Sequence, residues 1–154
     1  MKKYEAMFLM DGGHAAAHWD ERVTEIKTIL ERHGCQILRL VKWDDRRLAY
    51  SVNHSKRGTY VLVFYEAPRE ANRLVERDVQ LSDNLLRLLI VRREKMSVDE
   101  MMRYRVPSRE KNIVGENIEL PPEEPKPEEP PAPVRSPRRG GDDEDPGDGD
   151  FRDR

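Results

Sequence analysis

Four short apolar segments in the first 95 residues have the length and composition of β-strands. Each is seven to ten residues long, is rich in β-branched or aromatic residues, and ends close to turn-forming residues. They span residues 4–10, 35–43, 58–67 and 85–93. The second strand is expected to resume or bend at Asp44 and Asp45 and to continue to Tyr50, because polar residues interrupt its apolar pattern there.

Two segments between these strands repeat their apolar residues every three or four positions, which is the period of an α-helix. The first predicted helix covers 15–33 and ends at Gly34; its apolar stripe is Trp19, Val23, Ile26 and Leu30. The second covers 69–81. The resulting order, β-α-β-β-α-β, predicts an α+β, ferredoxin-like split βαβ fold. In that fold a four-stranded antiparallel sheet carries both helices on one face.

Both faces of this predicted sheet carry apolar side chains, although two helices cover only one face. Successive strand residues point to opposite faces, so each apolar strand contributes to both. The uncovered face is predicted to be a protein-partner surface, because large bare apolar patches are rare on monomers. Its expected members are Met7, Leu9, Tyr60, Leu62, Phe64, Leu89 and Val91. The alternative is that the tail of the chain, or a second copy, covers it.

The chain beyond residue 95 has a different composition. We expect a ferredoxin-like domain at 1–95, a short helical or extended linker at 96–111, and a disordered tail at 112–154. In the linker, Met101 and Met102 are expected to make a weak apolar contact. Nine of the eleven prolines lie from residue 121 onward. Residues 1–111 hold 22 Lys and Arg against 17 Asp and Glu, whereas the remainder holds 6 against 13. A modest positive excess suits a protein that shares a nucleic-acid site with a more basic partner.

Signals for enzymatic chemistry are weak. His14 and His18 are four residues apart, but no third metal ligand lies near them in the sequence. No Ser/His/Asp or Cys/His arrangement is visible, and we predict no catalytic residue, metal, cofactor or small-molecule substrate. Cys35 is the only cysteine, which excludes an internal disulfide and fits a reducing compartment. The apolar run at 6–10 is too short for a signal peptide or a membrane span, so we expect a cytoplasmic protein.

Basic residues gather at the ends of the predicted strands, where they can reach phosphates. The candidate RNA-binding residues are Lys2, Lys3, Tyr4, Arg46, Arg47, Tyr50, Arg87, Arg92 and Arg93. The two tyrosines among them can stack on bases or pack in the core. The run 57–64 invites comparison with the RNA recognition motif, which shares the βαββαβ order. Thr59 and Val61 stand where that motif has aromatic residues, so a base-stacking sheet is not expected.

Several segments resemble the bacterial small-subunit ribosomal protein six family in register from residue 1 to about residue 94. They are Lys3-Tyr4-Glu5, Arg46-Arg47-Leu48-Ala49-Tyr50, Gly58 with Tyr60 two residues later, and Asp83-Asn84-Leu85-Leu86-Arg87. The resemblance implies a structural ribosomal protein. It would bind the central domain (platform) of small-subunit 16S ribosomal RNA together with small-subunit ribosomal protein eighteen, and hold that partner on the sheet side. The competing hypothesis is a ferredoxin-like regulatory or ligand-binding domain that self-associates through its open face.

Overall fold

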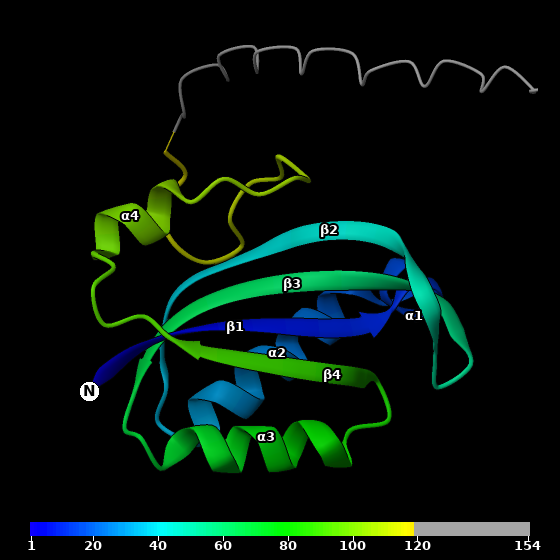
Figure 1. Ribbon diagram of the computed structural model, residues 1–154, viewed down its shortest axis with the longest axis horizontal. Coiled ribbons are helices and arrows are strands. Elements are labelled where there is room, and N and C mark those ends of the chain that lie inside the picture. Colours follow the sequence, from blue (N-terminus) through cyan, green and yellow to red (C-terminus); the bar gives the residue numbers. More distant parts are fainter. Residues whose placement is uncertain (119–154) are drawn as a thin grey trace, which may run out of the picture. The chain divides into compact units, whose positions relative to one another are not determined.

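The computed structural model describes residues 1–118 and contains one four-stranded sheet with two long helices on one face (Figure 1). The strands are β1 (Lys2–Asp11), β2 (Gln36–Val52), β3 (Ser55–Ala67) and β4 (Leu85–Arg92). The helices are α1 (Gly12–Ala17), α2 (Trp19–Arg32), α3 (Ala71–Leu81) and α4 (Val98–Arg103). All neighbouring strands are antiparallel, in the order β2-β3-β1-β4. The predicted ferredoxin-like α+β fold is confirmed.

The first helical segment is two helices rather than one. Asp11, directly after the predicted first strand, caps the N-terminus of α1: its side chain accepts a hydrogen bond from the His14 N–H at 2.8 Å. The backbone of His18, at φ −132° and ψ 41°, then separates α1 from α2. The end of α2 is as predicted: Gly34 has a φ of +71°, a conformation that glycine adopts without steric cost.

Strand β2 is continuous over 17 residues and bends where the sequence indicated. Its pairing with β3 shifts register between Lys42 and Asp44, which is a β-bulge. Farther along, Leu48 crosses over Gly58 of β3. A Cβ atom on Gly58 would lie 3.0 Å from the Leu48 side chain and would overlap that of Leu9. Glycine at this position therefore leaves room for the two leucine side chains, which a larger residue would displace.

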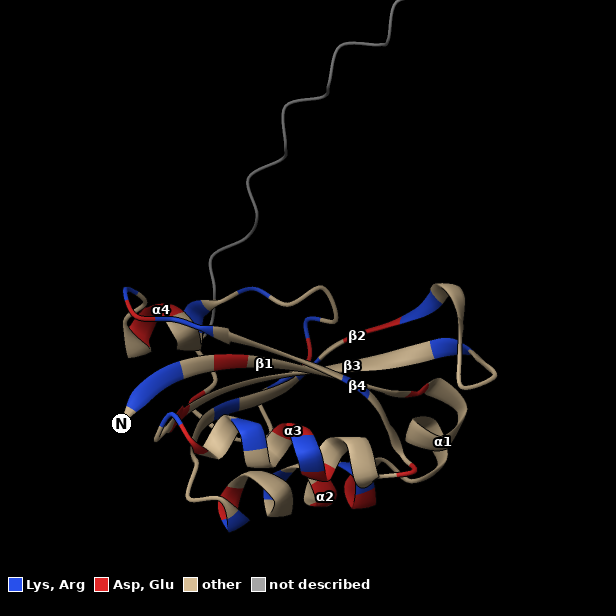
Figure 2. Cartoon of the chain, turned by 60° about the horizontal axis from the view of Figure 1, so that its bottom comes forward, with Lys and Arg blue, Asp and Glu red and all other residues tan. Residues whose placement is uncertain are grey.

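The main core lies between the sheet and the helices α2 and α3 (Figure 2). The strand parity deduced from the sequence is confirmed, since Ala6, Phe8, Val61 and Val63 are all fully buried in this core. Tyr4 belongs to it as well: its side chain is 4% exposed and its ring stacks on a core tyrosine at a centroid distance of 5.6 Å. The candidate role of Tyr4 in stacking on RNA bases is therefore wrong, and its alternative role in the core is correct.

The segment after β4 packs against the face opposite the helices, where the sequence suggested an open surface. We call residues 95–114 the strap. Met101 of α4 is fully buried in a second core with Leu62 and Phe64, and the ring of Tyr104 meets that of Phe64 edge-on at 5.8 Å. All the described residues belong to one compact unit, so the folded domain continues through the predicted boundary at 95 and the predicted linker.

Three members of the predicted open face are consequently buried. Leu62 and Phe64 have no exposed surface and Leu9 is 6% exposed. The expectation of exposure is wrong for these three residues, because the strap and the hairpin cover the sheet at their positions. Residues 112–118 of the predicted disordered tail are also described, and Val114 pairs with Leu40. The remainder of that predicted tail lies outside the described residues.

A buried arginine anchors the strap to β2. Arg39 is 4% exposed, and its guanidinium donates hydrogen bonds to the carbonyl oxygens of Met101 and Tyr104 at 2.6 and 2.7 Å. It also donates to the Asn112 side chain at 2.7 Å. Burial lowers the pKa of Arg39 from its ordinary value. The three acceptors compensate for the removal of this charge from water.

Candidate partner and nucleic-acid interface

The strap covers the β2 and β3 side of the sheet face opposite the helices, and the β1 and β4 side stays accessible. Leu89 and Val91 of β4 are 63% and 36% exposed. Met7 of β1, the register partner of Leu89, is half-buried, and so is Tyr60 of β3, which lies opposite Leu9 on the other side of β1. We call these four residues the open half-face. It retains four of the seven residues predicted for the partner surface, while Leu9, Leu62 and Phe64 lie beneath other parts of the chain.

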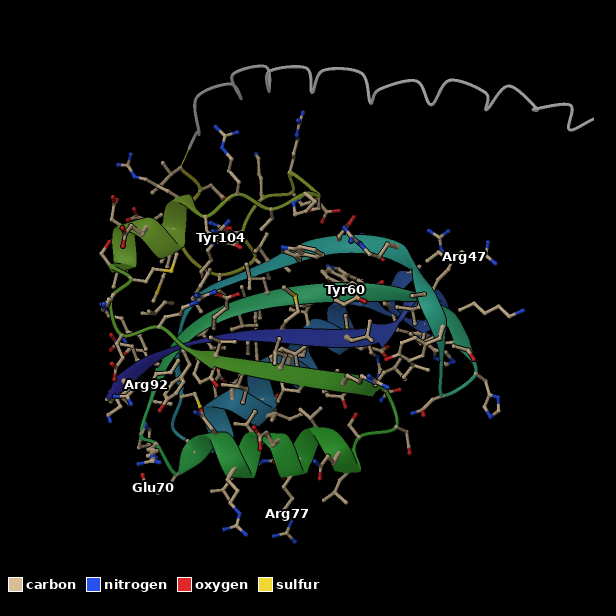
Figure 3. The ribbon with its side chains drawn as sticks, in the orientation of Figure 1. Arg47, Tyr60, Glu70, Arg77, Arg92 and Tyr104 are labelled. Carbon is tan, nitrogen blue, oxygen red and sulfur yellow. The ribbon has the colours of Figure 1, made fainter. Side chains whose placement is uncertain are left out.

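The candidate RNA-binding residues separate into two groups at opposite ends of the sheet, as the labelled Arg47 and Arg92 show in Figure 3. The hairpin group comprises Arg46, Arg47, Tyr50 and Arg87. The second group, at the start of β1 and the end of β4, comprises Lys2, Lys3, Arg92 and Arg93. The sequence does not reveal this division, because it depends on which strand ends adjoin in the antiparallel sheet.

Within the hairpin group, Arg87 and Tyr50 come together from β4 and β2. Arg87 donates a hydrogen bond to the Tyr50 hydroxyl at 3.0 Å, and its guanidinium lies 5.5 Å from the ring centroid. Tyr50 remains 62% exposed, so its ring is available to a base. Arg46 is already paired: its Nε donates to Asp44 at 2.9 Å, which holds the pKa of that carboxyl below its ordinary value.

Arg47 has the least compensated charge of the hairpin group. It is exposed and makes no ion pair within residues 1–118, and its register partner on β3 is Arg57. Like charges directly opposite each other repel, so the pair concentrates positive potential at the hairpin. Blue segments on both strands mark this region in Figure 2. The sequence marks Arg57 only as a basic residue before a strand; its pairing with Arg47 requires the register.

The second group is largely neutralised by contacts inside the domain. Arg93 donates a hydrogen bond to Glu5 at 2.7 Å, and this carboxylate raises the pKa of the arginine above its ordinary value. Arg92 forms an ion pair with Glu94, and the Lys3 ammonium donates to a strap carbonyl at 3.3 Å. Lys2 is exposed and makes no ion pair in the part of the chain that the structure describes. The hairpin group is thus the better candidate for phosphate binding.

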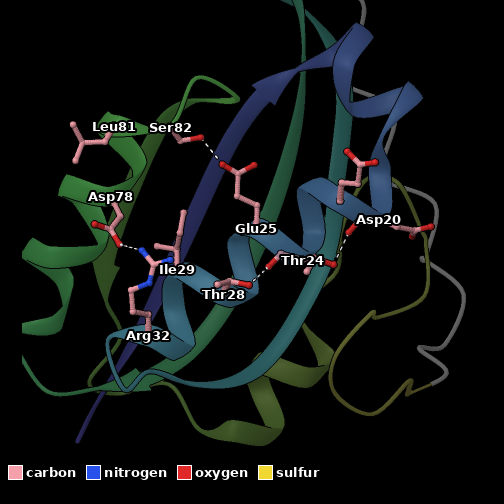
Figure 4. Close-up of a pocket in the computed structure, with 10 residues that line it drawn as sticks. Asp20, Thr24, Glu25, Thr28, Ile29, Arg32, Asp78, Leu81 and Ser82 are labelled. Atoms are coloured by element: carbon pink, nitrogen blue, oxygen red, sulfur yellow. Dashed lines mark hydrogen bonds and ion pairs between the residues drawn. The ribbon is translucent and has the colours of Figure 1, made fainter.

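A groove of about 730 Å³ lies between α2 and α3, on the helical side of the domain (Figure 4). Two of its acidic residues, Asp78 and Glu25, join the elements around it. Asp78 accepts from His33 at 2.8 Å and from Arg32 at 3.1 Å, and the His33 hydrogen bond is the main cause of its lowered pKa. Glu25 accepts from the Ser82 hydroxyl at 2.6 Å. These contacts join the two helices and the turn before β4.

The remaining candidate chemistry is not assembled into a site. The His14 and His18 rings are 6.5 Å apart, and residues 1–118 contain no group of three His, Cys, Asp or Glu side chains placed to hold a metal ion. Cys35 is buried, which raises the pKa of its thiol to about 11. Among the described residues, no helix has the length and apolar character needed to span a membrane.

The fold and these surfaces define a class: a ferredoxin-like α+β domain with a half-open apolar sheet face and cationic strand ends. The family model described as ribosomal protein S6 matches residues 3–92. The chain belongs to the ribosomal protein S6 family. It is accordingly a structural, non-enzymatic protein of the small ribosomal subunit in the cytoplasm, and its role is in translation.

Individual relatives agree with this assignment. The small ribosomal subunit protein bS6 of Desulforamulus reducens is 30% identical over 92 residues, covering 60% of this chain and 97% of that protein. The bS6 protein of Bartonella bacilliformis is 30% identical over 121 residues, covering 79% of this chain and 88% of that protein. The crystal structure of 30S ribosomal protein S6 from Thermotoga maritima has a TM-score of 0.54 at 19% identity. It covers 60% of this chain and 87% of its own, and supports the fold.

Proposed function

We propose that this chain binds the central domain (platform) of 16S ribosomal RNA together with small-subunit ribosomal protein eighteen. The observation that carries the proposal is the continuity of two surfaces along β4. Arg87, Leu89 and Val91 alternate along the strand and therefore share one face. Arg87 adjoins the cationic hairpin, and the two apolar residues form the exposed part of the open half-face. RNA and a protein partner can thus meet side by side.

On the RNA side, the hairpin group supplies the backbone contacts. Arg47 presents an uncompensated guanidinium, and guanidinium groups bind phosphate in a bidentate manner. Tyr50 presents an exposed ring that Arg87 holds in place. Lys2 and Arg92, at the far end of the sheet, contribute secondary contacts. The modest charge of the domain suits a complex in which protein eighteen provides further cationic residues.

On the protein side, the open half-face is the contact surface for protein eighteen. Leu89 and Val91 are apolar and exposed, and Leu89 lies opposite the half-buried Met7. Burial of such a patch by a partner is favourable at about 25 cal/mol per Å² of apolar area removed from water. The strap limits the contact to this half of the sheet.

The RNA contact is tested with Arg46→Ala combined with Arg47→Ala in the full chain. We expect weaker binding to a central-domain 16S fragment and a flatter dependence of log affinity on log salt, by about one unit for each phosphate group that the variant no longer binds. Because Arg46 already pairs with Asp44, the change should be nearer one unit than two. The matched control is Arg73→Ala with Arg77→Ala on exposed positions of α3. An unchanged slope in the hairpin variant would remove the hairpin from the RNA interface.

Joint binding is tested by measuring the affinity of the chain for the same RNA fragment with and without purified protein eighteen. The proposal expects tighter binding in its presence, since each protein then contributes part of one cationic surface. Equal affinity in both conditions would contradict joint binding.

A further inference from the structure

The two edge strands of the sheet differ in what lies beyond them. The outer edge of β2 is occupied by the strap: the Leu40 N–H donates to the Val114 carbonyl at 3.0 Å, and the Ile113 N–H donates to the Leu40 carbonyl at 2.8 Å. Ser108 adds a hydrogen bond from its N–H to the Trp43 carbonyl at 3.1 Å. Between Leu40 and Trp43, the β2 edge is therefore not open to another chain.

The outer edge of β4 has no such cover within residues 1–118. The Arg93 N–H donates to the Lys3 carbonyl at 2.9 Å, so alternate residues from 93 back to 87 form the hydrogen-bonded pairs with β1. The residues between them, Leu88, Ile90 and Arg92, direct their N–H and C=O groups away from β1. No described residue contacts those groups through a backbone hydrogen bond.

The side chains of β4 suit an added strand. Leu88 and Ile90 pack against the main core from the helical side, which holds the strand in place. Leu89 and Val91, on the opposite face, are exposed and apolar at alternate positions. Arg87 completes this row. Within the described residues, its guanidinium contacts Tyr50, which is neutral, so the positive charge of Arg87 is not compensated. An extended segment lying along β4 would therefore find open backbone groups, two apolar contacts and one cation.

We propose that protein eighteen docks on this chain by adding an extended segment to the outer edge of β4, an inference that rests on the proposed function. The added segment forms backbone hydrogen bonds with Leu88, Ile90 and Arg92. It places alternate apolar side chains beside Leu89 and Val91 and an acidic side chain within reach of Arg87. This is recognition by strand addition, in which backbone bonds supply affinity and alternate side chains supply specificity.

A second copy of the chain is a poorer occupant of the same edge. In an antiparallel pairing of two β4 strands that sets Leu89 opposite Val91, Arg87 of one copy faces Arg93 of the other. Like charges directly opposite are destabilising in a sheet. Arginine at both ends of an edge strand also discourages edge-to-edge association in general.

The decisive measurement is amide hydrogen exchange of the full chain, free and bound to purified protein eighteen. We expect the outward N–H groups of Leu88, Ile90 and Arg92 to exchange rapidly in the free chain. Their exchange should slow by about tenfold or more in the complex. The inward N–H groups of Leu89 and Val91 already pair with β1 and act as the internal control, with little change.

Variants of matched chemistry test the side chains. Leu89→Asp should weaken binding of protein eighteen by about tenfold or more. Leu81→Asp introduces the same charge at a leucine that is 73% exposed at the end of α3, on the helical side of the domain, and should leave binding unchanged. Ile90→Pro removes an outward N–H without removing a bond to β1 and should also weaken binding. Circular dichroism verifies that each variant is folded before binding is measured.

The outcomes separate the two proposals. Binding of protein eighteen with slowed exchange at the outward amides supports both. Binding with unchanged exchange there overturns strand addition and leaves the proposed partner standing. Absence of binding overturns the proposed partner and strand addition together. Slowed exchange in the chain alone, with a dimer in analytical ultracentrifugation, overturns the inference in favour of a second copy.

Discussion

The contribution of Arg39 to strap docking can be measured directly by substituting Arg39→Met in the full chain. Methionine keeps a long side chain but removes the guanidinium that donates to Met101, Tyr104 and Asn112. Hydrogen bonds to a charged group contribute about 1.5–3 kcal/mol each. Three of them would total about 4.5–9 kcal/mol if the strap were forced to remain in place.

The substitution also removes a cost, and this limits the loss. Methionine carries no charge to be taken out of water, whereas burial of the Arg39 guanidinium is unfavourable enough to lower its pKa. We therefore expect the free energy of strap opening to fall by about 2–4 kcal/mol, less than the sum of the three bonds. This corresponds to amide exchange that is about 30- to 700-fold faster, since each 1.4 kcal/mol is a factor of ten.

Native-state hydrogen exchange measures this effect at the strap amides that donate to β2, which are those of Ser108, Ile113 and Val114. The amides of β1, which pair inside the sheet, should keep their protection. Arg73→Met on the exposed side of α3 is the matched control and should change neither set. Unchanged exchange at the strap amides, or equal acceleration in β1, would refute the assignment of Arg39 as a local anchor of the strap.

Burial and charge elsewhere in the domain lead to three more expectations. Leu62→Asp places a carboxylate in the second core and should unfold the domain or lower its free energy of unfolding by about 3 kcal/mol or more. Near-wild-type stability in urea unfolding would contradict the burial of Leu62. Cys35, with a pKa of about 11, should react slowly with a thiol reagent at pH 8 until the chain unfolds, and rapid native-state labelling would contradict its burial. The hydrogen bond from His33 lowers the folded-state pKa of Asp78 below its ordinary 3.8, so stability from this pair is present above that value and is lost as pH falls through the folded pKa. Asp78→Asn should make unfolding less dependent on pH below the ordinary pKa of 3.8. An identical acid profile in variant and wild type would show that the pair does not act in this way.

The arrangement of the sheet was predictable because two periods in the sequence have direct geometric meaning. Alternation in the strands placed Phe8 and Val63 on the helical face, and both are buried there. The bulge near Asp44 was also indicated by polar residues within an apolar strand. The break at His18 was not predicted, since the apolar stripe of α2 gives no signal for a separate helix in front of it.

The strap was predicted only as the alternative in which the tail covers the open face, with Met101 as a weak apolar contact, because its attachment uses few side chains with a recognisable pattern. Its bonds to β2 join backbone groups, and its one deeply buried residue is Met101. One sequence signal did exist: Arg39 lies between Leu38 and Leu40 in an apolar strand, and a buried arginine needs acceptors from elsewhere in the chain. That signal identifies the need for a partner but does not identify the partner segment.

The sequence by itself determined the element order, the two faces of the sheet and the set of cationic residues, because hydrophobic periodicity and charge are local properties of the chain. The tertiary structure alone decided which apolar residues remain exposed and which charges remain uncompensated. Leu62 and Leu89 have the same parity and chemistry, yet the strap buries the first and leaves the second 63% exposed. Arg46 and Arg47 are neighbours, yet only Arg46 is neutralised by Asp44. Exposure and pairing depend on segments distant in sequence, and those contacts exist only once the chain has folded.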